Sequence, residues 1–434
     1  MKIAIRPSAA VTCNSDFDVL ENPAIHIENG RISYIGPAHY APPFEADETV
    51  AGEHLVAMPG LVNTHTHAAM TLVRGYADDM ALEPWLSQKI WPYEANLEAQ
   101  HVYFGTLLAI LEMVRGGTTT FADMYFFGDD GARAMLESGI RACPGAVLLG
   151  FLPGADEKIA SGIAWAKNWN GEGNGRIVPT MAPHSLYTCD ENQWRKMIAG
   201  ARDLGILMHT HAGETPKEVA DVRAKWGQSP IQTLQKIGAL DGPLMAAHCV
   251  HTDETDREIM AAHDLRVAHN PQSNLKLASG IAPILDYQKR GLKIGLGPDG
   301  TASNNNLDMW EELRLAATLH KATSGEPTAI SAREALEMAT IGGARCLNLD
   351  AEIGSLEIGK KADLVLVDFD KPHLYPRHNV VSHLVYAAHS SDVCATMVDG
   401  KWLFKNGEFE TLDAAKICAT CESFARDLVR KAQP

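Results

Sequence analysis

The sequence lacks the features that would place the chain in a membrane or on a nucleic acid. No stretch approaches the roughly 20 consecutive apolar residues that a membrane-spanning helix needs. Arg6 and Pro7 interrupt the amino-terminal segment, so it has no apolar core of the kind found in signal peptides. Basic residues are scarce: 38 Lys and Arg stand against 54 Asp and Glu, and a net charge of −16 repels phosphate backbones. We therefore expect a cytoplasmic protein that binds neither membranes nor nucleic acids.

Several cofactor and catalytic motifs are also missing. No Gly-rich nucleotide-binding fingerprint opens the chain, and GLGPDG (295–300) lacks the spacing of a phosphate loop. The 8 cysteines are scattered, as expected for reduced core residues. Cys418 and Cys421 form a CxxC, but they lie in DAAKICATCESFARDLV, which has the pattern of an amphipathic C-terminal helix. No Pro precedes this CxxC and no HxE matches it upstream, which excludes the HxE…PCxxC class of zinc deaminases.

What is present is an ordinary globular composition on a long chain. The 434 residues are 46% hydrophobic and 21% charged, enough for a large barrel and a smaller domain. Alternating segments surround Asn29-Gly30 and Asp399-Gly400, and such dipeptides favour type I′ hairpins. Because these hairpins lie near opposite ends of the chain, we predict one small β-sandwich domain from residues 1–56 and 357–434, with a C-terminal helix.

The middle of the chain, residues 57–356, alternates apolar β-rich runs with helical patterns. This alternation is typical of an α/β fold with a parallel sheet. Eight repeats at this length favour a closed, TIM-like (β/α)8 barrel over an open sheet. The expected strand segments are LVNTHTH (61–67), TTTFADM (118–124), ACPGAVLLG (142–150), IVPTMAPH (177–184), ILMHTHAGE (206–214), LMAAHCV (244–250), LRVAHNP (265–271) and LKIGLGPDG (292–300).

Side chains that can bind a metal fall at the ends of these segments. His65 and His67 are two residues apart and so share one face of a strand. His211, His248 and Asp299 end the fifth, sixth and eighth segments, and in a barrel these ends converge on the face that carries active sites. Three neutral imidazoles and a carboxylate suit Zn²⁺, although Fe, Mn or Ni would also bind. The predicted ligands are His65, His67, His211 and Asp299.

Four motifs in this order resemble a known family. They are PGLVNTHTH (59–67), HAGE (211–214), AHC (247–249) and GPDG (297–300). They are similar to the amidohydrolase superfamily, and most of all to its methylthioadenosine/S-adenosylhomocysteine deaminases and chlorotriazine hydrolases. The resemblance covers nearly the whole chain. It implies a metal-dependent hydrolase on the predicted barrel, assembled as a homodimer or homotetramer.

The resemblance also implies the number of metal ions. Binuclear members carry a carboxylated Lys at the end of the fourth strand, but residues 175–194 contain no Lys. This absence indicates the mononuclear, deaminase-like branch, with one Zn²⁺ per subunit. That branch has a Glu three residues after the third metal-binding His, and His211 followed by Glu214 matches this pattern.

The chemistry of such a site assigns a role to each polar group. A bound metal lowers the pKa of its water, and Asp299 can accept that water's proton. His248 can orient the attacking hydroxide and stabilise charge that builds up on the reacting carbon. Glu214 can contact the substrate, protonate a ring nitrogen and relay protons to the leaving ammonia. The resemblance to aminopurine deaminases implies the same division of labour.

Two further residues bear on the substrate. Glu94 in WPYE resembles the family's Glu that binds ribose hydroxyls, and His184 in APHS resembles a substrate-contacting His. His209 shares a strand face with His211 and is expected to lie deeper in the core. We predict a deaminase that converts 5′-methylthioadenosine and/or S-adenosylhomocysteine to the inosine analogue and ammonia. The alternative is a related enzyme acting on a triazine, guanine or another aminated heterocycle, for which Glu94 would matter less. A non-catalytic scaffold is a third reading, which the complete set of ligands argues against.

Overall fold

The computed structural model describes residues 1–432, and the chain divides into two compact units. The first unit comprises residues 1–63, 111–120 and 308–412, and the second comprises 64–110, 121–307 and the chain from Asp413 onward. The C-terminal helix thus belongs to the second unit, whereas the sequence-based prediction assigned it to the small β domain. Within the described residues, no helix has the length and apolar character needed to cross a membrane.

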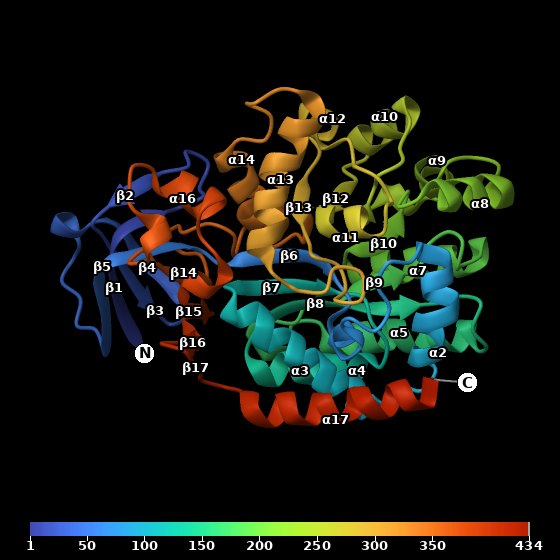
Figure 1. Cartoon of the computed structure of the whole chain (residues 1–434), viewed down its shortest axis with the longest axis horizontal. Coiled ribbons are helices and arrows are strands. Elements are labelled where there is room, and N and C mark those ends of the chain that lie inside the picture. Colours follow the sequence, from blue (N-terminus) through green and yellow to red (C-terminus); the bar gives the residue numbers. More distant parts are fainter. Residues whose placement is uncertain (433–434) are drawn as a thin grey trace. The chain divides into compact units, whose positions relative to one another are not determined.

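Both ends of the chain contribute to one nine-stranded sheet in the first unit (Figure 1). The strand order is β17-β16-β15-β14-β5-β1-β3-β4, with β2 paired to β1. The sheet is mixed, because β1 runs parallel to β5 while β14 runs antiparallel to it. The strands are β1 (Lys2–Val11), β2 (Val19–Glu21), β3 (Pro23–Glu28), β4 (Arg31–Pro37), β5 (Glu48–Pro59), β14 (Leu364–Asp368), β15 (Val393–Val398), β16 (Lys401–Lys405) and β17 (Glu408–Phe409).

The sheet encloses one apolar cluster. Its members come from β1, β3, β4, β5, β14, β15 and the chain just before β14. They include Ile5, Ile25, Leu364 and Met397, all of them fully buried. Ile5 lies opposite Ile25, and Leu364 lies opposite Met397, so one face of each strand pair points into this cluster. A small β-sandwich domain built from both termini is therefore confirmed.

Both expected hairpins are present. The β3–β4 turn has Asn29 at φ 52° and Gly30 at φ 77°, between the paired residues Glu28 and Arg31. The β15–β16 turn has Asp399 at φ 51° and Gly400 at φ 73°. Positive φ at both central positions is the signature of a type I′ turn, which matches the twist of the flanking strands.

The barrel predicted for the middle of the chain, residues 57–356, is present as a closed barrel of eight strands. The strands follow one another around the barrel in chain order, β13 closes onto β6, and neighbours such as β10 and β11 run parallel. The (β/α)8 architecture is therefore confirmed. Seven of the eight strands fall inside their predicted segments, and β8 begins one residue before its segment, at Arg141. The strands are β6 (Leu61–Thr66), β7 (Thr118–Asp123), β8 (Arg141–Leu148), β9 (Thr180–Pro183), β10 (Met208–Ala212), β11 (Leu244–His248), β12 (Arg266–His269) and β13 (Ile294–Leu296).

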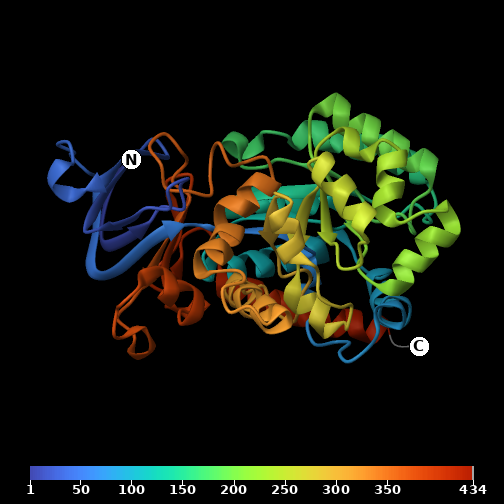
Figure 2. The ribbon, with the colours of Figure 1, turned by 90° about the horizontal axis from the view of Figure 1, so that it is seen from above.

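Helices connect the barrel strands, and the green and yellow ones lie outside them in Figure 2. The helix α7 shows how the sequence sets such boundaries. Asp190 Oδ1 accepts a hydrogen bond from the Gln193 amide at 2.9 Å, and Gln193 Oε1 accepts one from the Asp190 amide at 2.8 Å. This capping box begins the helix, and Gly205 at φ 65° ends it.

The bounds of the helices are as follows. They are α1 (Leu82–Trp85), α2 (Trp91–Glu94), α3 (Ala99–Arg115), α4 (Gly128–Ser138), α5 (Ala155–Trp169), α6 (Glu172–Gly175), α7 (Glu191–Leu204), α8 (Pro216–Trp226), α9 (Pro230–Lys236), α10 (Glu254–Ala262), α11 (Pro271–Lys276), α12 (Ile284–Lys289), α13 (Met309–Ser324), α14 (Ala332–Glu337), α15 (Gly343–Cys346), α16 (Val380–Tyr386) and α17 (Ala414–Ala432).

The CxxC lies on the amphipathic helix α17, as the sequence predicts. This helix packs against α2 and the short helix η2 (Ala68–Val73). Cys421 is buried and its thiol contacts the Phe104 carbonyl at 3.3 Å, whereas Cys418 is exposed. All eight cysteines are free thiols, and within the CxxC Cys421 contributes to packing while Cys418 faces solvent.

Candidate metal centre and active site

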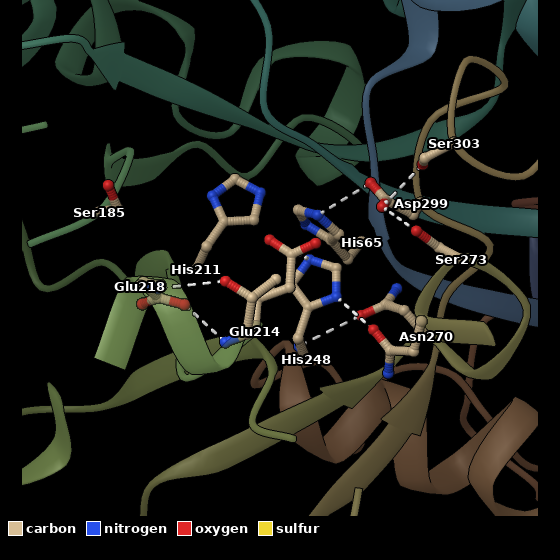
Figure 3. Close-up of polar contacts among 12 residues, drawn as sticks. His65, Ser185, His211, Glu214, Glu218, His248, Asn270, Ser273, Asp299 and Ser303 are labelled. Carbon is tan, nitrogen blue, oxygen red and sulfur yellow. Dashed lines mark hydrogen bonds and ion pairs between the residues drawn. The ribbon is translucent and has the colours of Figure 1, made fainter. Parts of the chain in front are cut away.

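The candidate site lies at the carboxyl ends of the barrel strands, entirely within the second unit. β6 carries His65 and is followed at once by His67, β10 carries His211, and β11 ends at His248. Asp299 follows β13 by three residues. Figure 3 shows His65, His211, Glu214, His248 and Asp299 directed toward one common space. The convergence that the sequence predicts for these strand ends is therefore present.

The donor atoms are close enough to share one ion. His65 Nε2 and His67 Nε2 each lie 3.4 Å from Asp299 Oδ1. His211 Nε2 lies 3.3 Å from His67 Nε2. Within the groups His65/His67/His211 and His65/His248/Asp299, all ligand atoms lie within 4.8 Å of one another. Three imidazoles and a carboxylate at this spacing fit a divalent metal ion.

The protonation of two imidazoles is set by backbone carbonyls. His67 Nδ1 lies 2.6 Å from the Met124 carbonyl oxygen, and His211 Nδ1 lies 2.8 Å from that of His184. A carbonyl only accepts, so each Nδ1 carries the proton and each Nε2 presents a lone pair to the centre. Burial also lowers the pKa of His211 well below its usual value and that of His65 to about 4. Neutral imidazoles are the form that binds a metal.

His209 lies behind this layer, as the sequence predicts. Its Nε2 is 2.9 Å from His65 Nδ1, and its side chain is fully buried. A proton shared between these two atoms leaves His65 Nε2 facing Asp299. His209 therefore orients His65 from within the barrel.

Asp299 is held as an ionised carboxylate. Ser273 and Ser303 donate hydrogen bonds to its Oδ2 at 2.7 and 2.9 Å, which leaves Oδ1 toward the two histidines (Figure 3). Burial opposes ionisation, but the hydrogen bond with His65 and the electrostatic interactions with the neighbouring histidines outweigh it and hold the pKa of Asp299 well below its usual value. Asp299 also has φ 64°, an unfavourable backbone conformation of the kind that clusters at functional sites.

Glu214 and His248 form a second polar pair beside the metal donors. His248 Nε2 lies 3.8 Å from Glu214 Oε2, and His248 Nδ1 is 2.8 Å from Asn274 Oδ1. Burial raises the pKa of Glu214 to about 7, and the negative charge of Asp299 adds to that rise. The two carboxyl groups thus differ in ionisation, with Asp299 charged and Glu214 able to carry a proton near neutral pH.

Glu94 and His184 line the same cavity. This cavity has a volume of about 70 Å³. Glu94 Oε1 accepts a hydrogen bond from the Tyr125 hydroxyl at 2.9 Å, and burial raises the Glu94 pKa to about 7. Burial lowers the pKa of His184 to about 3, so this imidazole is neutral. The structure brings together every predicted site residue, because all except His65 line the cavity and His65 contacts Asp299.

Several residues that hold the site residues in position were not predicted from the sequence. Ser273 and Asn274 belong to the run NPQSN after β12, and a polar run at that strand end was the available signal. Tyr125 follows β7 in the same way. Glu218 accepts hydrogen bonds from the amides of Gly213 at 3.0 Å and Glu214 at 2.6 Å, and it lies on a helix where nothing in its sequence marks it (Figure 3).

The GPDG motif has a steric function at Gly297. A Cβ atom at this position would lie 2.7 Å from the His65 amide nitrogen and 2.8 Å from its carbonyl oxygen. Replacing Gly297 with Ala should therefore destabilise the protein by about 3 kcal/mol, because backbone atoms cannot rotate away as a side chain can. Thermal unfolding and metal content measure this effect. The control is Gly242→Ala, where a Cβ meets nothing within 4 Å; equal melting temperatures for the two variants would contradict the steric account.

Comparison with known proteins agrees with this geometry. The amidohydrolase family model matches residues 56–403. A 5-methylthioadenosine/S-adenosylhomocysteine deaminase of Dictyoglomus thermophilum is 49% identical over 385 residues, which cover 89% of this chain and 90% of that protein. The structure of an adenosine deaminase from Xanthomonas campestris with bound zinc has a TM-score of 0.95 and 38% identity, covering 99% of this chain and 98% of that one.

A third similarity concerns the fold alone. The zinc complex of an atrazine chlorohydrolase from Arthrobacter aurescens has a TM-score of 0.90 at 24% identity, covering 98% of this chain and 100% of that one. The family resemblance predicted from the four motifs is confirmed by the match over residues 56–403. By that match, and by its 49% identity to a relative over most of both lengths, the chain belongs to the amidohydrolase family.

Proposed function

We propose that this chain is a zinc-dependent hydrolytic deaminase of 5′-methylthioadenosine and/or S-adenosylhomocysteine. The products are the corresponding inosine analogue and ammonia. The proposal rests mainly on one observation. A single cavity is lined by metal donors, by the carboxyl group of Glu214, which can hold a proton near neutral pH, and by the carboxyl group of Glu94. The Dictyoglomus relative named for these two substrates and the zinc-bound Xanthomonas deaminase support it. A homodimer or homotetramer, testable by light scattering, is part of the proposal.

His65, His67, His211 and Asp299 would hold one zinc ion per subunit. When bound, the ion lowers the pKa of water toward neutrality and polarises the reacting centre. The orientation of the histidines supports this assignment, because carbonyls of Met124 and His184 leave the Nε2 atoms of His67 and His211 facing the centre. The absence of Lys from residues 175–194 supports a single ion.

The protein's own groups then divide the proton transfers. Asp299 stays ionised, so it accepts the proton of the attacking water. Glu214 carries a proton near pH 7 and delivers it to a ring nitrogen, which makes the amino-bearing carbon more electrophilic. His248 lies beside Glu214 and orients the attacking oxygen. The proton that Asp299 takes from the water passes to the amino group, which leaves as ammonia, and the second proton of that water returns Glu214 to its protonated form.

Glu94 binds the ribose in this proposal. Above its raised pKa of about 7, the Glu94 carboxylate can accept hydrogen bonds from two adjacent hydroxyls at once, and the Tyr125 hydroxyl holds its Oε1 in place. His184 lies on the cavity wall with Nδ1 toward Ser185 Oγ at 3.2 Å, and it contacts the substrate base or ribose from that wall.

Ammonia release measures the proposed activity directly. The zinc-loaded protein is incubated with adenosine, 5′-methylthioadenosine, S-adenosylhomocysteine, guanine and a chlorotriazine. We expect ammonia from the adenosine derivatives. Turnover of guanine or the triazine alone would contradict the substrate assignment and support the alternative.

Replacing Glu94 with Gln separates a nucleoside from a bare heterocycle. Gln presents only one acceptor atom and carries no charge, so kcat/KM for nucleosides should fall by about 10- to 100-fold, as expected when a charged hydrogen bond is lost. The control is Glu83→Gln in the same excursion, whose side chain is 67% exposed. A Glu94→Gln variant with unchanged kcat/KM for adenosine would remove Glu94 from the ribose site.

A further inference from the structure

His248 and Cys249 have a backbone conformation that L-amino acids rarely adopt. Their φ angles are 73° and 46°, in the left-handed region where the β-carbon crowds the following carbonyl. The Cys249 amide also lies 3.1 Å from the Ala247 carbonyl oxygen, so this hydrogen bond spans a single residue. With φ 73° at its centre, the turn has the features of the rare, strained form of γ-turn. Two such residues in succession persist only where their surroundings hold them.

The turn sets the position of the His248 imidazole. His248 Nε2 lies 3.8 Å from Glu214 Oε2, and His248 Nδ1 lies 2.8 Å from Asn274 Oδ1. Both distances depend on the backbone of His248, because rotation about its φ angle turns the Cα–Cβ bond and carries the ring with it. Relaxation of the turn toward a favourable φ would therefore displace the imidazole from the site.

The hydroxyl of Tyr287, on α12, binds this turn at the Cys249 carbonyl. The two oxygen atoms are 2.6 Å apart, and the Tyr287 side chain is fully buried. Burial raises the pKa of Tyr287, so the hydroxyl keeps its proton at neutral pH. Because a carbonyl can only accept, Tyr287 is the donor. The bond fixes the peptide plane that follows Cys249 and so opposes relaxation of the turn.

Two further residues extend this bond into a chain. Since the proton of Tyr287 goes to the carbonyl, the Thr252 hydroxyl, 2.8 Å away, donates to the Tyr287 oxygen. Arg257 Nε donates in turn to the Thr252 hydroxyl oxygen at 3.2 Å, and Asp286 holds the Arg257 guanidinium at 3.1 Å. Donors that follow one another in the same direction polarise each other, which strengthens the last bond of the chain.

The amides after the turn connect it to the loop of the general acid. Val250 and His251 both donate to the Gly213 carbonyl oxygen, at 2.9 and 2.8 Å. Gly213 directly precedes Glu214 in the chain. The exchange of these two amides with solvent therefore reports whether the turn is held.

We propose that Tyr287 is a positioning residue for His248, whose hydroxyl keeps the strained turn at residues 248 and 249 in the conformation that the reaction requires. The inference rests on the proposed function, in which His248 orients the attacking oxygen. In that function Glu94 and His184 contact the nucleoside, and they lie on α2 and after β9. Loss of the Tyr287 hydroxyl should therefore slow the chemical step more than it weakens substrate binding.

Tyr287→Phe removes the hydroxyl and keeps the ring. The Cys249 carbonyl is left without this donor, so kcat for 5′-methylthioadenosine should fall by about 10- to 100-fold while KM changes by less than about threefold. Metal content should not change. The matched control is Tyr34→Phe, because the Tyr34 hydroxyl also binds a backbone carbonyl, that of Pro37 at 2.9 Å, but lies in the first unit. A kcat of Tyr287→Phe within about twofold of wild type, or a loss confined to KM, would overturn the inference.

Thr252→Val gives a graded second variant. It removes the donor behind Tyr287 and should lower kcat by a smaller factor, about threefold, with KM unchanged. If Tyr287→Phe does not fold, this variant decides in its place. An unchanged kcat would then contradict the role of the chain.

A glycine at position 249 tests whether Tyr287 acts through the strained backbone. Glycine adopts a left-handed φ without strain, so Tyr287→Phe should cost about five- to tenfold less in kcat in the Cys249→Gly background than in wild type. Cys249→Ala also removes the thiol but keeps the β-carbon, and in that background the full loss should remain. The same loss in all three backgrounds would show that the hydroxyl does not act through the turn.

A failure of the proposed function is distinguishable from a failure of this inference. If wild-type protein releases no ammonia from any adenosine derivative, the proposed function is wrong, and hydrogen exchange measured by mass spectrometry then decides on Tyr287. Tyr287→Phe should speed the exchange of the Val250 and His251 amides by about tenfold or more, and by a smaller factor in the Cys249→Gly background. Unchanged exchange, or an equal factor in both backgrounds, would overturn the inference.

Discussion

Replacing Asp299 with Asn should lower kcat by about 10⁴-fold while the protein remains folded. An amide does not accept the proton of the attacking water, and it is a weaker metal ligand than a carboxylate. Ser273 and Ser303 can still donate hydrogen bonds to the amide oxygen, so the packing around residue 299 survives. Ammonia release, metal content and thermal unfolding measure the three quantities separately.

The control for Asp299→Asn replaces an exposed carboxyl group elsewhere in the chain. Asp203→Asn alters an aspartate whose side chain is 76% exposed, and it should leave all three quantities unchanged. If Asp299→Asn loses metal, kcat is compared after loading with excess zinc. A metal-loaded variant that keeps more than a tenth of the wild-type kcat would exclude Asp299 as the base.

The second large effect is expected at Glu214. Glu214→Gln is nearly isosteric, yet its amide has no acidic proton to give to the ring nitrogen, so kcat should fall by about 10³-fold. Metal content should not change, because Glu214 is not among the predicted ligands. The Glu218 carboxylate accepts hydrogen bonds from the backbone amides of Gly213 and Glu214, and these amides remain in the variant, so the loop keeps its position.

The dependence of kcat/KM on pH also tests the assignment of Glu214 as the general acid. Burial raises the pKa of Glu214 to about 7, so its carboxyl group is protonated below that pH and ionised above it. Since the protonated form is the acid, wild-type kcat/KM should decline as pH rises through about 7, and Glu214→Gln should lack this decline. Glu191→Gln, with a side chain 52% exposed, is the control and should keep the wild-type profile. A decline that persists in Glu214→Gln belongs to another group.

The sequence alone predicted the elements that depend on short runs of neighbouring residues, namely the barrel strands, the hairpins and the His65/His67 pair. The barrel strands are short apolar runs bounded by polar residues. Every one lies inside its predicted segment except β8, which begins one residue earlier, at Arg141. The hairpins at Asn29-Gly30 and Asp399-Gly400 follow from two residues that tolerate positive φ. His65 and His67 share a strand face because side chains alternate with a period of two. Because every predicted ligand lies at the carboxyl end of a barrel strand, all of them meet at one end of the barrel.

Only the tertiary structure decided how those residues are oriented and charged. The carbonyls that set the His67 and His211 tautomers lie 57 and 27 residues away in the chain, at Met124 and His184. Ser273, 26 residues from Asp299, orients its carboxylate. The different ionisation of Asp299 and Glu214 depends on burial and on neighbouring charges. Local patterns carry no information about such contacts, since barrel closure brings together atoms that the sequence keeps apart.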